Sequence, residues 1–206
     1  ISKGTEADQF LVPLIDCLRS SIKFITIPVT SAEDANLFFE SLNARGKELA
    51  ISDLVKNRLY YESEENLSRA EQLWENMETQ LIRRPIPEYL RHYWIAKKAD
   101  NKGLNVREKQ LYRSISTYVK GKKSRALELL VDLSESSHYY AMISDYRLWP
   151  DDEAYGSDLE ESLRELRLFR VTQCNPLLLN AIQRFKSPKE ISKTFRIVAN
   201  FSFRYF

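Results

Sequence analysis

One short turn, Asn43-Ala44-Arg45-Gly46-Lys47, holds the residue types best suited to binding a ligand. Asn43 and Gly46 adopt positive φ more readily than other residues, so they let the chain reverse between two helices. The helix that follows such a turn presents free backbone N–H groups, and Arg45 and Lys47 add positive charge beside them. The turn is therefore a candidate site for an anion or a phosphate. The competing interpretation is a helix corner with solvated charges, because short Asn/Gly turns are common.

No other group of residues has the spacing of a catalytic or metal site. The two cysteines and two histidines of the sequence complete no zinc motif. The acidic run 151–153 lacks the pattern of a calcium-binding loop, and no glycine-rich phosphate loop occurs. We therefore assign no catalytic residue and no metal ligand, and we expect no cofactor in this chain. Both cysteines are expected to be reduced thiols.

Charge is distributed in alternating blocks along the chain. Residues 82–125 carry 13 Lys and Arg against 3 Asp and Glu, whereas residues 1–81 carry 8 against 14. Residues 126–170 carry 4 against 11, and residues 171–206 carry 6 against 1. The formal net charge of +2 hides these blocks. The strongly basic block 82–125 is thus the first place to look for a polyanionic partner.

Clustered basic side chains neutralise phosphates and release counterions, which gives a salt-dependent affinity for DNA. Those of the basic block that we expect at helix ends or in loops are Arg83, Arg84, Lys97, Lys98, Lys120, Lys122, Lys123 and Arg125. We take these eight as candidate DNA-binding residues. The alternative is that they pair with the acidic blocks on either side. The aromatic residues among them recur at helical spacing, so we expect those to be core.

The spacing of apolar residues predicts a mainly α fold, a multi-helix bundle with one short strand near residues 23–29. Leu67, Ala70, Leu73, Trp74, Met77 and Leu81 follow the three-and-four spacing of an amphipathic helix. Asn175-Pro176 and Ser187-Pro188 are typical helix starts, with proline at the first helical position. A lone strand cannot satisfy its own backbone, so its partners are expected upstream of residue 1.

The chain begins without Met and stops in an apolar run, so we expect a fragment of a longer protein. We divide it into residues 1–61, the end of an N-terminal domain, and residues 62–206, a helical domain. No apolar run approaches the ~20 residues that a membrane span needs. No signal peptide is recognisable at the start. A cytoplasmic protein with no membrane partner is the expectation.

Two segments carry a resemblance to a known family. Phe39-Glu40-Ser41-Leu42-Asn43-Ala44-Arg45-Gly46-Lys47-Glu48-Leu49, with Asp53, Leu54, Lys56 and Asn57 after it, is similar to the end of the N-terminal domain of GmrSD-type restriction endonucleases. Tyr89-Leu90-Arg91-His92-Tyr93-Trp94 resembles the Phe-Leu-Arg-His-Tyr-Trp helix of that family. The two segments occur in the family's order. The helix after the turn departs from the family, because Ala50 and Ile51 replace its usual Ser-Pro.

The resemblance implies an upstream α/β domain of ParB/sulfiredoxin-like fold with an Asp-Gly-Gln-Gln-Arg motif, and in many members a later HNH nuclease domain. It implies a nucleoside triphosphate and a divalent cation for the parent protein, and action on DNA, including modified phage DNA. Neither motif occurs in this sequence. By the resemblance, Asn43, Arg45, Gly46 and Lys47 are candidates for the nucleotide pocket.

Two functions follow as hypotheses. In the first, the chain is the helical, DNA-positioning portion of a nucleotide-dependent restriction endonuclease and has no catalytic residues of its own. Its partners would be DNA and the missing nucleotide-hydrolysing and nuclease domains. In the second, it is a scaffold for protein interaction or for oligomerisation, including a homo-oligomer, with the charge blocks docking between subunits.

Overall fold

The computed structural model describes residues 6–21, 28, 51–82, 84–97, 108–150 and 153–205. The chain divides into two units, residues 1–48 and 49–206. The division falls earlier in the chain than the domain limit that we drew at residue 61. Of the predicted strand 23–29, all residues but Pro28 lie outside the described part of the chain.

The first unit contains helix α1 (Glu6–Ser21). Pro13 lies inside this helix, where a proline removes one backbone hydrogen bond. The apolar side chains of Leu11, Val12, Leu14 and Ile15 are exposed.

The second unit is a bundle of helices, so the predicted mainly α fold is confirmed. The larger helices are α3 (Ile51–Glu62), α4 (Leu67–Leu81), α5 (Ile86–Lys97), α6 (Glu108–Val119), α7 (Lys123–Ser144), α8 (Gly156–Leu168), α9 (Asn175–Arg184) and α10 (Pro188–Tyr205). Short 3₁₀ turns η1 (Glu64–Asn66), η2 (Tyr146–Leu148) and η3 (Glu153–Tyr155) connect some of them. The described residues contain no β-strand.

Apolar spacing and proline positions explain where several helices form. In α4, the buried residues are Ala70, Trp74, Met77 and Leu81, four of the six that the sequence pattern selects. Leu73 packs partly buried against the core, and Leu67 is exposed. Helix α9 begins at Asn175 and α10 at Pro188, as predicted from the two prolines. Asn175 differs in one respect from the expected cap, because it lies just inside α9 and is buried.

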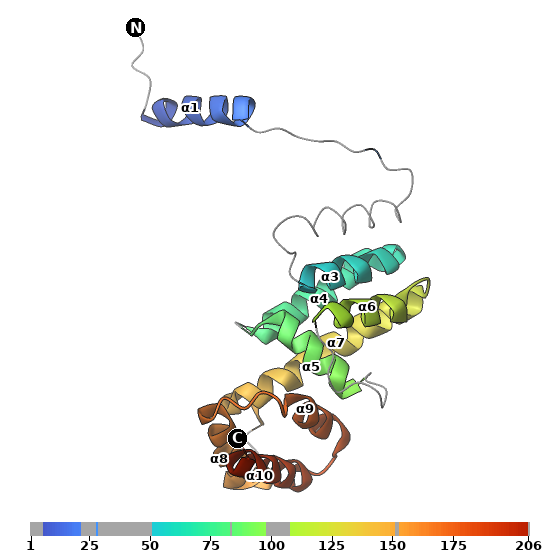
Figure 1. Ribbon diagram of the computed structural model, residues 1–206, viewed down its shortest axis with the longest axis vertical. Helices are drawn as coiled ribbons and strands as arrows, with labels where there is room; N and C mark the ends of the chain where they lie inside the picture. Colours follow the sequence, from blue (N-terminus) through green and yellow to red (C-terminus); the bar gives the residue numbers. More distant parts are fainter. Residues whose placement is uncertain are drawn as a thin grey trace. The chain divides into compact units, whose positions relative to one another are not determined.

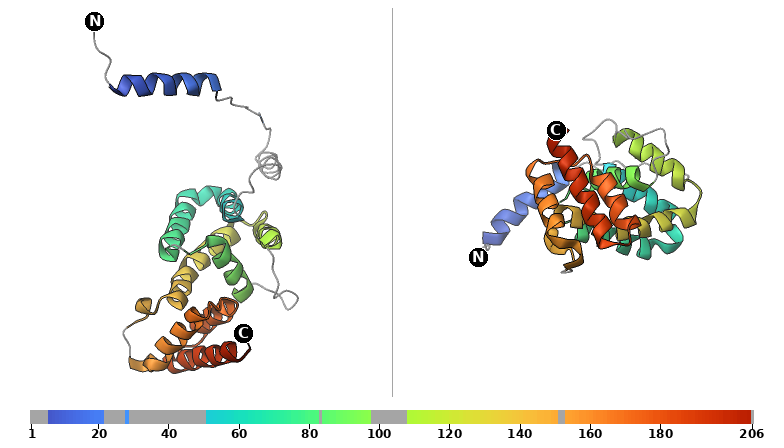
Figure 2. Two further views of the ribbon diagram at one scale, coloured as in Figure 1. Left: turned by 60° about the vertical axis from the view of Figure 1, so that its left-hand side comes forward. Right: turned by 90° about the horizontal axis from the view of Figure 1, so that it is seen from below.

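Helix α7 is the centre of the second unit. It contacts α3, α4, α5, α6, α8 and α9, and it runs from the α3–α6 end of the unit to the α8–α10 end (Figures 1 and 2). Ser134, Ser136 and Ser137 are buried on it, and their small side chains let neighbouring helices approach. Ser137 donates a hydrogen bond to Gln80 of α4, and Ser136 accepts one from Gln183 of α9. The surrounding helices are therefore tied to α7 by polar as well as apolar contacts.

Helix α5 lies against α7 through a buried aromatic row, Tyr89, His92 and Tyr93. The hydroxyl of Tyr89 donates to the carbonyl of Leu133 at 2.5 Å, and that of Tyr93 donates to Asp132 at 2.6 Å. Tyr89 and Tyr93 are fully buried and Trp94 nearly so, which confirms the expectation that these aromatic residues are core. Tyr112 and Tyr118 of α6 pack against the same core.

Helices α8 and α10 run side by side in the same direction. Arg196 of α10 pairs with Glu161 and Glu165 of α8, and further along Phe169 contacts Phe203 with their ring centroids 5.4 Å apart. Trp149, which precedes α8 in the chain, packs edge-on against Phe195 of α10 with ring centroids 5.6 Å apart. Among the described residues, no helix is both long and apolar enough to cross a membrane.

Burial of His92 predicts that the fold loses stability in acid. Burial, and then the charge of Arg91, lowers the pKa of His92 to about 4 from its ordinary 6.5. The unfolded chain therefore takes up the proton first, and stability falls as the pH drops from about 6.5 to about 4. Complete loss of this contribution is worth about 3 kcal/mol.

The measurement is urea unfolding of wild type and His92→Asn between pH 7.5 and 4. We expect the difference in unfolding free energy between the two proteins to shrink as the pH falls, because only wild type carries the imidazole. A difference that stays constant over this range would contradict the assignment.

Candidate nucleic-acid interface

The connection between α6 and α7 brings four of the candidate DNA-binding residues together: Lys120, Lys122, Lys123 and Arg125. Gly121 has φ of +67°, a value that side-chain-bearing residues rarely adopt, so glycine allows the reversal. The N–H of Lys122 donates to the carbonyl of Val119 at 2.9 Å, which closes the turn. The basic residues thus lie on a tight, hydrogen-bonded turn.

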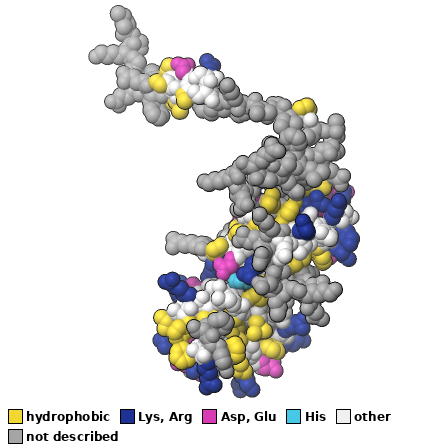
Figure 3. All heavy atoms as spheres, in the orientation of Figure 1, with side chains coloured by type: hydrophobic (Ala, Val, Ile, Leu, Met, Phe, Trp, Pro, Cys, Tyr) yellow, Lys and Arg dark blue, Asp and Glu magenta, His cyan; other side chains and the backbone are white. Residues whose placement is uncertain are grey.

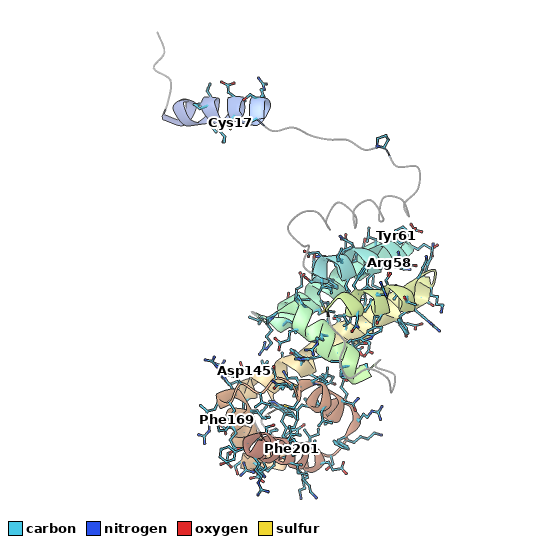
Figure 4. All side chains as sticks on the ribbon, viewed as in Figure 1. Cys17, Arg58, Tyr61, Asp145, Phe169 and Phe201 are labelled. Carbon is cyan, nitrogen blue, oxygen red and sulfur yellow. The ribbon has the colours of Figure 1, made fainter. Side chains whose placement is uncertain are left out.

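A buried carboxylate anchors this turn to α3. Glu62 is 5% exposed, and its two oxygens accept from the guanidinium of Arg58 at 2.5 Å and from the backbone N–H of Gly121 at 3.0 Å. Arg58 in turn lies 5.5 Å from the ring of Tyr61, also on α3 (Figure 4). A buried charge needs such partners, so Glu62 fixes the turn at one position on α3.

Lys123, the first residue of α7, also contributes to the anchoring. Its ammonium donates to Glu64 at 3.0 Å and to Glu65 at 2.9 Å, both in η1. These hydrogen bonds raise the pKa of Lys123 above its ordinary value. Of the four cations at the turn, Lys123 follows the alternative that we left open, pairing with a neighbouring acidic block.

The remaining cations of the turn are exposed, and the described part of the chain offers them no acidic partner. Lys120 and Lys122 are exposed, and neither has an ion pair among the described residues. Arg125 is exposed and lies 5.3 Å from the ring of Tyr118. Arg113 is exposed on α6, seven residues before Lys120 and so on the same helix face. We call Arg113, Lys120, Lys122 and Arg125 the α6–α7 basic surface; dark blue side chains gather there in Figure 3.

Two other candidates have structural partners. Arg84 donates to the carbonyls of Leu81 and Ala141, at the C-terminal ends of α4 and α7, where a cation is favoured by the helix dipoles. Its partial burial lowers its pKa. Lys97 pairs with Asp132 at 3.1 Å. Neither belongs to the α6–α7 basic surface.

Several predicted site residues fall on undescribed parts of the chain. These are Asn43, Arg45, Gly46 and Lys47 of the proposed nucleotide pocket, and Arg83 and Lys98 of the proposed DNA-binding set. The described residues contain no group of three or more side chains arranged to hold a metal ion.

Sequence reasoning missed Arg113 and Glu62. Arg113 has a signal in the sequence, since its seven-residue spacing from Lys120 places both on one helical face. Glu62 has none, because its partner Gly121 is 59 residues away in the chain.

Comparison with models of protein families, with curated proteins and with solved structures finds no match for this chain.

Loss of the Glu62 carboxylate is predicted to destabilise the turn. Glu62→Gln keeps an acceptor for Gly121 but leaves the guanidinium of Arg58, whose side chain is 12% exposed, without its counter-charge. We expect the free energy of unfolding in urea to fall by about 3 kcal/mol. The matched control is Glu64→Gln, which removes an exposed carboxylate and should cost less than about 1 kcal/mol. Equal effects of the two changes would rule out the anchoring role.

Proposed function

We propose that this chain is a DNA-positioning helical module and that the α6–α7 basic surface contacts the phosphate backbone. The observation that carries the proposal is that Lys120, Lys122 and Arg125 stay exposed, with no acidic partner in the described part of the chain, on a turn whose backbone is anchored by Glu62. Phosphate contacts of this kind orient a duplex without reading its sequence. The module would hold DNA and leave its chemistry to other domains.

The anchoring supports this function over a merely solvated charge run. A cation on a freely moving loop loses conformational freedom when it binds, whereas the backbone of this turn is already ordered. Arg125 is restrained further by its contact with Tyr118. Lys123 is bound to Glu64 and Glu65, so the same turn contains both a structural cation and cations that are left for a partner.

The likeness to GmrSD-type restriction endonucleases adds the rest of the proposal. In it, a neighbouring domain hydrolyses a nucleoside triphosphate with a divalent cation, and a nuclease domain cuts DNA in the cytoplasm as a defence against phage. Asn43, Arg45, Gly46 and Lys47 would border the nucleotide pocket of that neighbour. The two segments quoted from the sequence support this part.

The salt dependence of DNA binding tests the proposal. We expect the full 206-residue chain to bind a labelled duplex in fluorescence anisotropy, with log affinity falling linearly with log salt. The triple change Lys120→Gln, Lys122→Gln, Arg125→Gln should make that slope shallower by about 0.9 for each phosphate that the variant no longer neutralises.

Two controls separate local contacts from net charge. The matched triple Arg164→Gln, Arg167→Gln, Lys189→Gln removes the same charge from exposed positions on α8 and α10 and should leave the slope nearly unchanged. Lys123→Gln should also leave it unchanged, because Lys123 is already paired. A chain that binds no duplex at low salt, or an equal change of slope in both triples, would refute the proposal.

One observation favours a second function, self-association through an exposed apolar surface. Large apolar side chains at the ends of α8 and α10 face solvent, and Leu168 is 74% and Phe203 68% exposed. They form two groups, which we call together the α8–α10 apolar surface: Leu168, Phe169 and Phe203 at the helix ends, and Ile197 with Phe201 one turn apart on α10. Figure 4 labels one residue of each group, Phe169 and Phe201, and Figure 3 shows apolar side chains in this part of the molecule. Exposed apolar patches of this kind mark interfaces, and aromatic residues are enriched in them.

Self-association and DNA binding predict opposite responses to salt. Arg167 and Arg204 lie in the last turns of α8 and α10, beside the exposed apolar residues of the helix ends, so two copies would repel each other until salt screens them. We expect sedimentation velocity to show assembly that increases with protein and salt concentration, and that Ile197→Glu with Phe201→Ser abolishes. Tyr146→Ser, at an exposed residue of η2, is the control. A chain that stays monomeric at high concentration and high salt excludes this function.

A further inference from the structure

An open pocket of about 690 Å³ lies between α5 and α9. One face of α5 forms the first wall of the pocket. The second wall consists of the first turns of α9 and of residues 172–173, which precede that helix. The lining includes Glu88, Arg91, His92 and Ile95 from the first wall, and Gln173, Pro176 and Leu177 from the second. The size is in the range of small-molecule sites. The functions proposed above make no use of this pocket.

His92 is the unusual residue in this lining. It is 2% exposed, yet it reaches the pocket wall from the buried side of α5. Its Nδ1 lies 2.8 Å from the hydroxyl of Tyr140, on α7. Among the described residues its second ring nitrogen, Nε2, has no hydrogen-bond partner. Nε2 is not one of the fully buried atoms that lack a partner, so it is open to the pocket, and a ligand in the pocket can accept a hydrogen bond from it.

The hydrogen bonds around Tyr140 determine which nitrogen carries the proton. The Tyr140 oxygen accepts a weak bond from Asn175 at 3.5 Å, and burial raises the pKa of this hydroxyl, so it keeps its proton. Among the described residues, the acceptor in hydrogen-bond contact with that hydroxyl is Nδ1 of His92. The pKa of His92 is lowered to about 4, so the ring is neutral at pH 7. Nδ1 therefore accepts, and the ring proton is on Nε2.

The other polar groups of the pocket favour an anion beside His92. Arg91 contributes a positive charge to the lining. Residues Pro176 and Leu177, in the first turn of α9, line the pocket, so the positive end of this helix dipole lies at the pocket wall. No side chain in the described part of the chain caps this helix end. Glu88, one turn before His92, repels an anion at its own end and accepts hydrogen bonds from a donor there. These charges give a ligand one preferred direction.

We infer that the α5–α9 pocket binds a small ligand whose oxyanion, a carboxylate or a phosphate, accepts the Nε2–H of His92. An apolar part of the ligand lies on the pocket wall that Ile95, Pro176 and Leu177 form. This inference does not depend on DNA binding.

Ligand titrations followed by NMR of the full chain, with its histidine rings labelled with ¹⁵N, test the inference. The probes are phenyl phosphate and benzoate, with benzyl alcohol and benzylamine as the neutral and cationic controls. We expect at least one anion to bind and to shift the Nε2 resonance of His92, while neither control does. Binding of phenyl phosphate alone identifies a phosphate ligand, and binding of benzoate alone or of both identifies a carboxylate-accepting site. No binding of either anion overturns the inference.

Two conservative variants separate the two ring nitrogens. Asn at position 92 keeps a polar atom near the place of Nδ1, and Gln keeps one near the place of Nε2. His92→Asn should therefore weaken anion binding about tenfold or more, whereas His92→Gln should retain most of it. Equal binding by wild type and both variants would overturn the role of Nε2–H.

A variant at the exposed rim keeps the test valid if position 92 does not tolerate change. Gln173 is exposed, so substitutions there leave the core intact. Gln173→Lys adds a positive charge at the rim and should strengthen anion binding severalfold relative to wild type. Gln173→Glu adds a negative charge and should weaken it. Thr117→Lys and Thr117→Glu, on the exposed face of α6, are the matched controls and should change nothing. Equal affinities of the two Gln173 variants would overturn the inference.

Discussion

The buried hydroxyl groups of α5 set the constraint on which the second unit depends. A tyrosine that is removed from water needs a partner for its hydroxyl, and Tyr89 and Tyr93 find theirs at Leu133 and Asp132 of α7. Apolar packing alone would let α5 slide along α7 at small cost, but these bonds allow one register. The hydrogen bond between Tyr140 and His92 is a third polar contact between the two helices, two turns further along α7. One helix pair thus positions both the core and the wall of the α5–α9 pocket.

Some cations of the basic block 82–125 bind partners within the fold, and others remain exposed to solvent. Arg84 neutralises the carbonyl ends of α4 and α7, Lys97 pairs with Asp132, and Lys123 holds η1. An exposed pair of this kind contributes little to stability, so the role of Lys123 is to orient the turn rather than to stabilise the fold. Glu62 is different because it is buried, and its removal would leave Arg58 unbalanced. The net charge of a segment therefore says little about how many of its cations are available to bind another molecule.

Local patterns in the sequence predicted the helices, and long-range contacts could not be predicted. The spacing of Trp74, Met77 and Leu81 and the prolines at the starts of α9 and α10 act within a few residues, which is why those predictions are confirmed. Lys123 meets Glu65 across 58 residues, and His92 meets Tyr140 across 48. Nothing local distinguishes Lys123 from Lys122, although of the two only Lys123 has acidic partners among the residues that the structure describes. The pocket was missed for the same reason, since its two walls come from helices that are far apart in the chain.

The α6–α7 basic surface and the α5–α9 pocket can act independently. Lys123 and Tyr140 are 17 residues apart on α7, which corresponds to about 25 Å along a helix that rises 1.5 Å per residue. At physiological ionic strength the Debye length is about 8 Å, so charge bound at one site is largely screened from the other. Any coupling between them would have to pass through α7 itself, by a shift of its register against α5. The hydrogen bonds of Tyr89 and Tyr93 oppose such a shift, because moving α7 would carry the Leu133 carbonyl and the Asp132 carboxylate away from these hydroxyls.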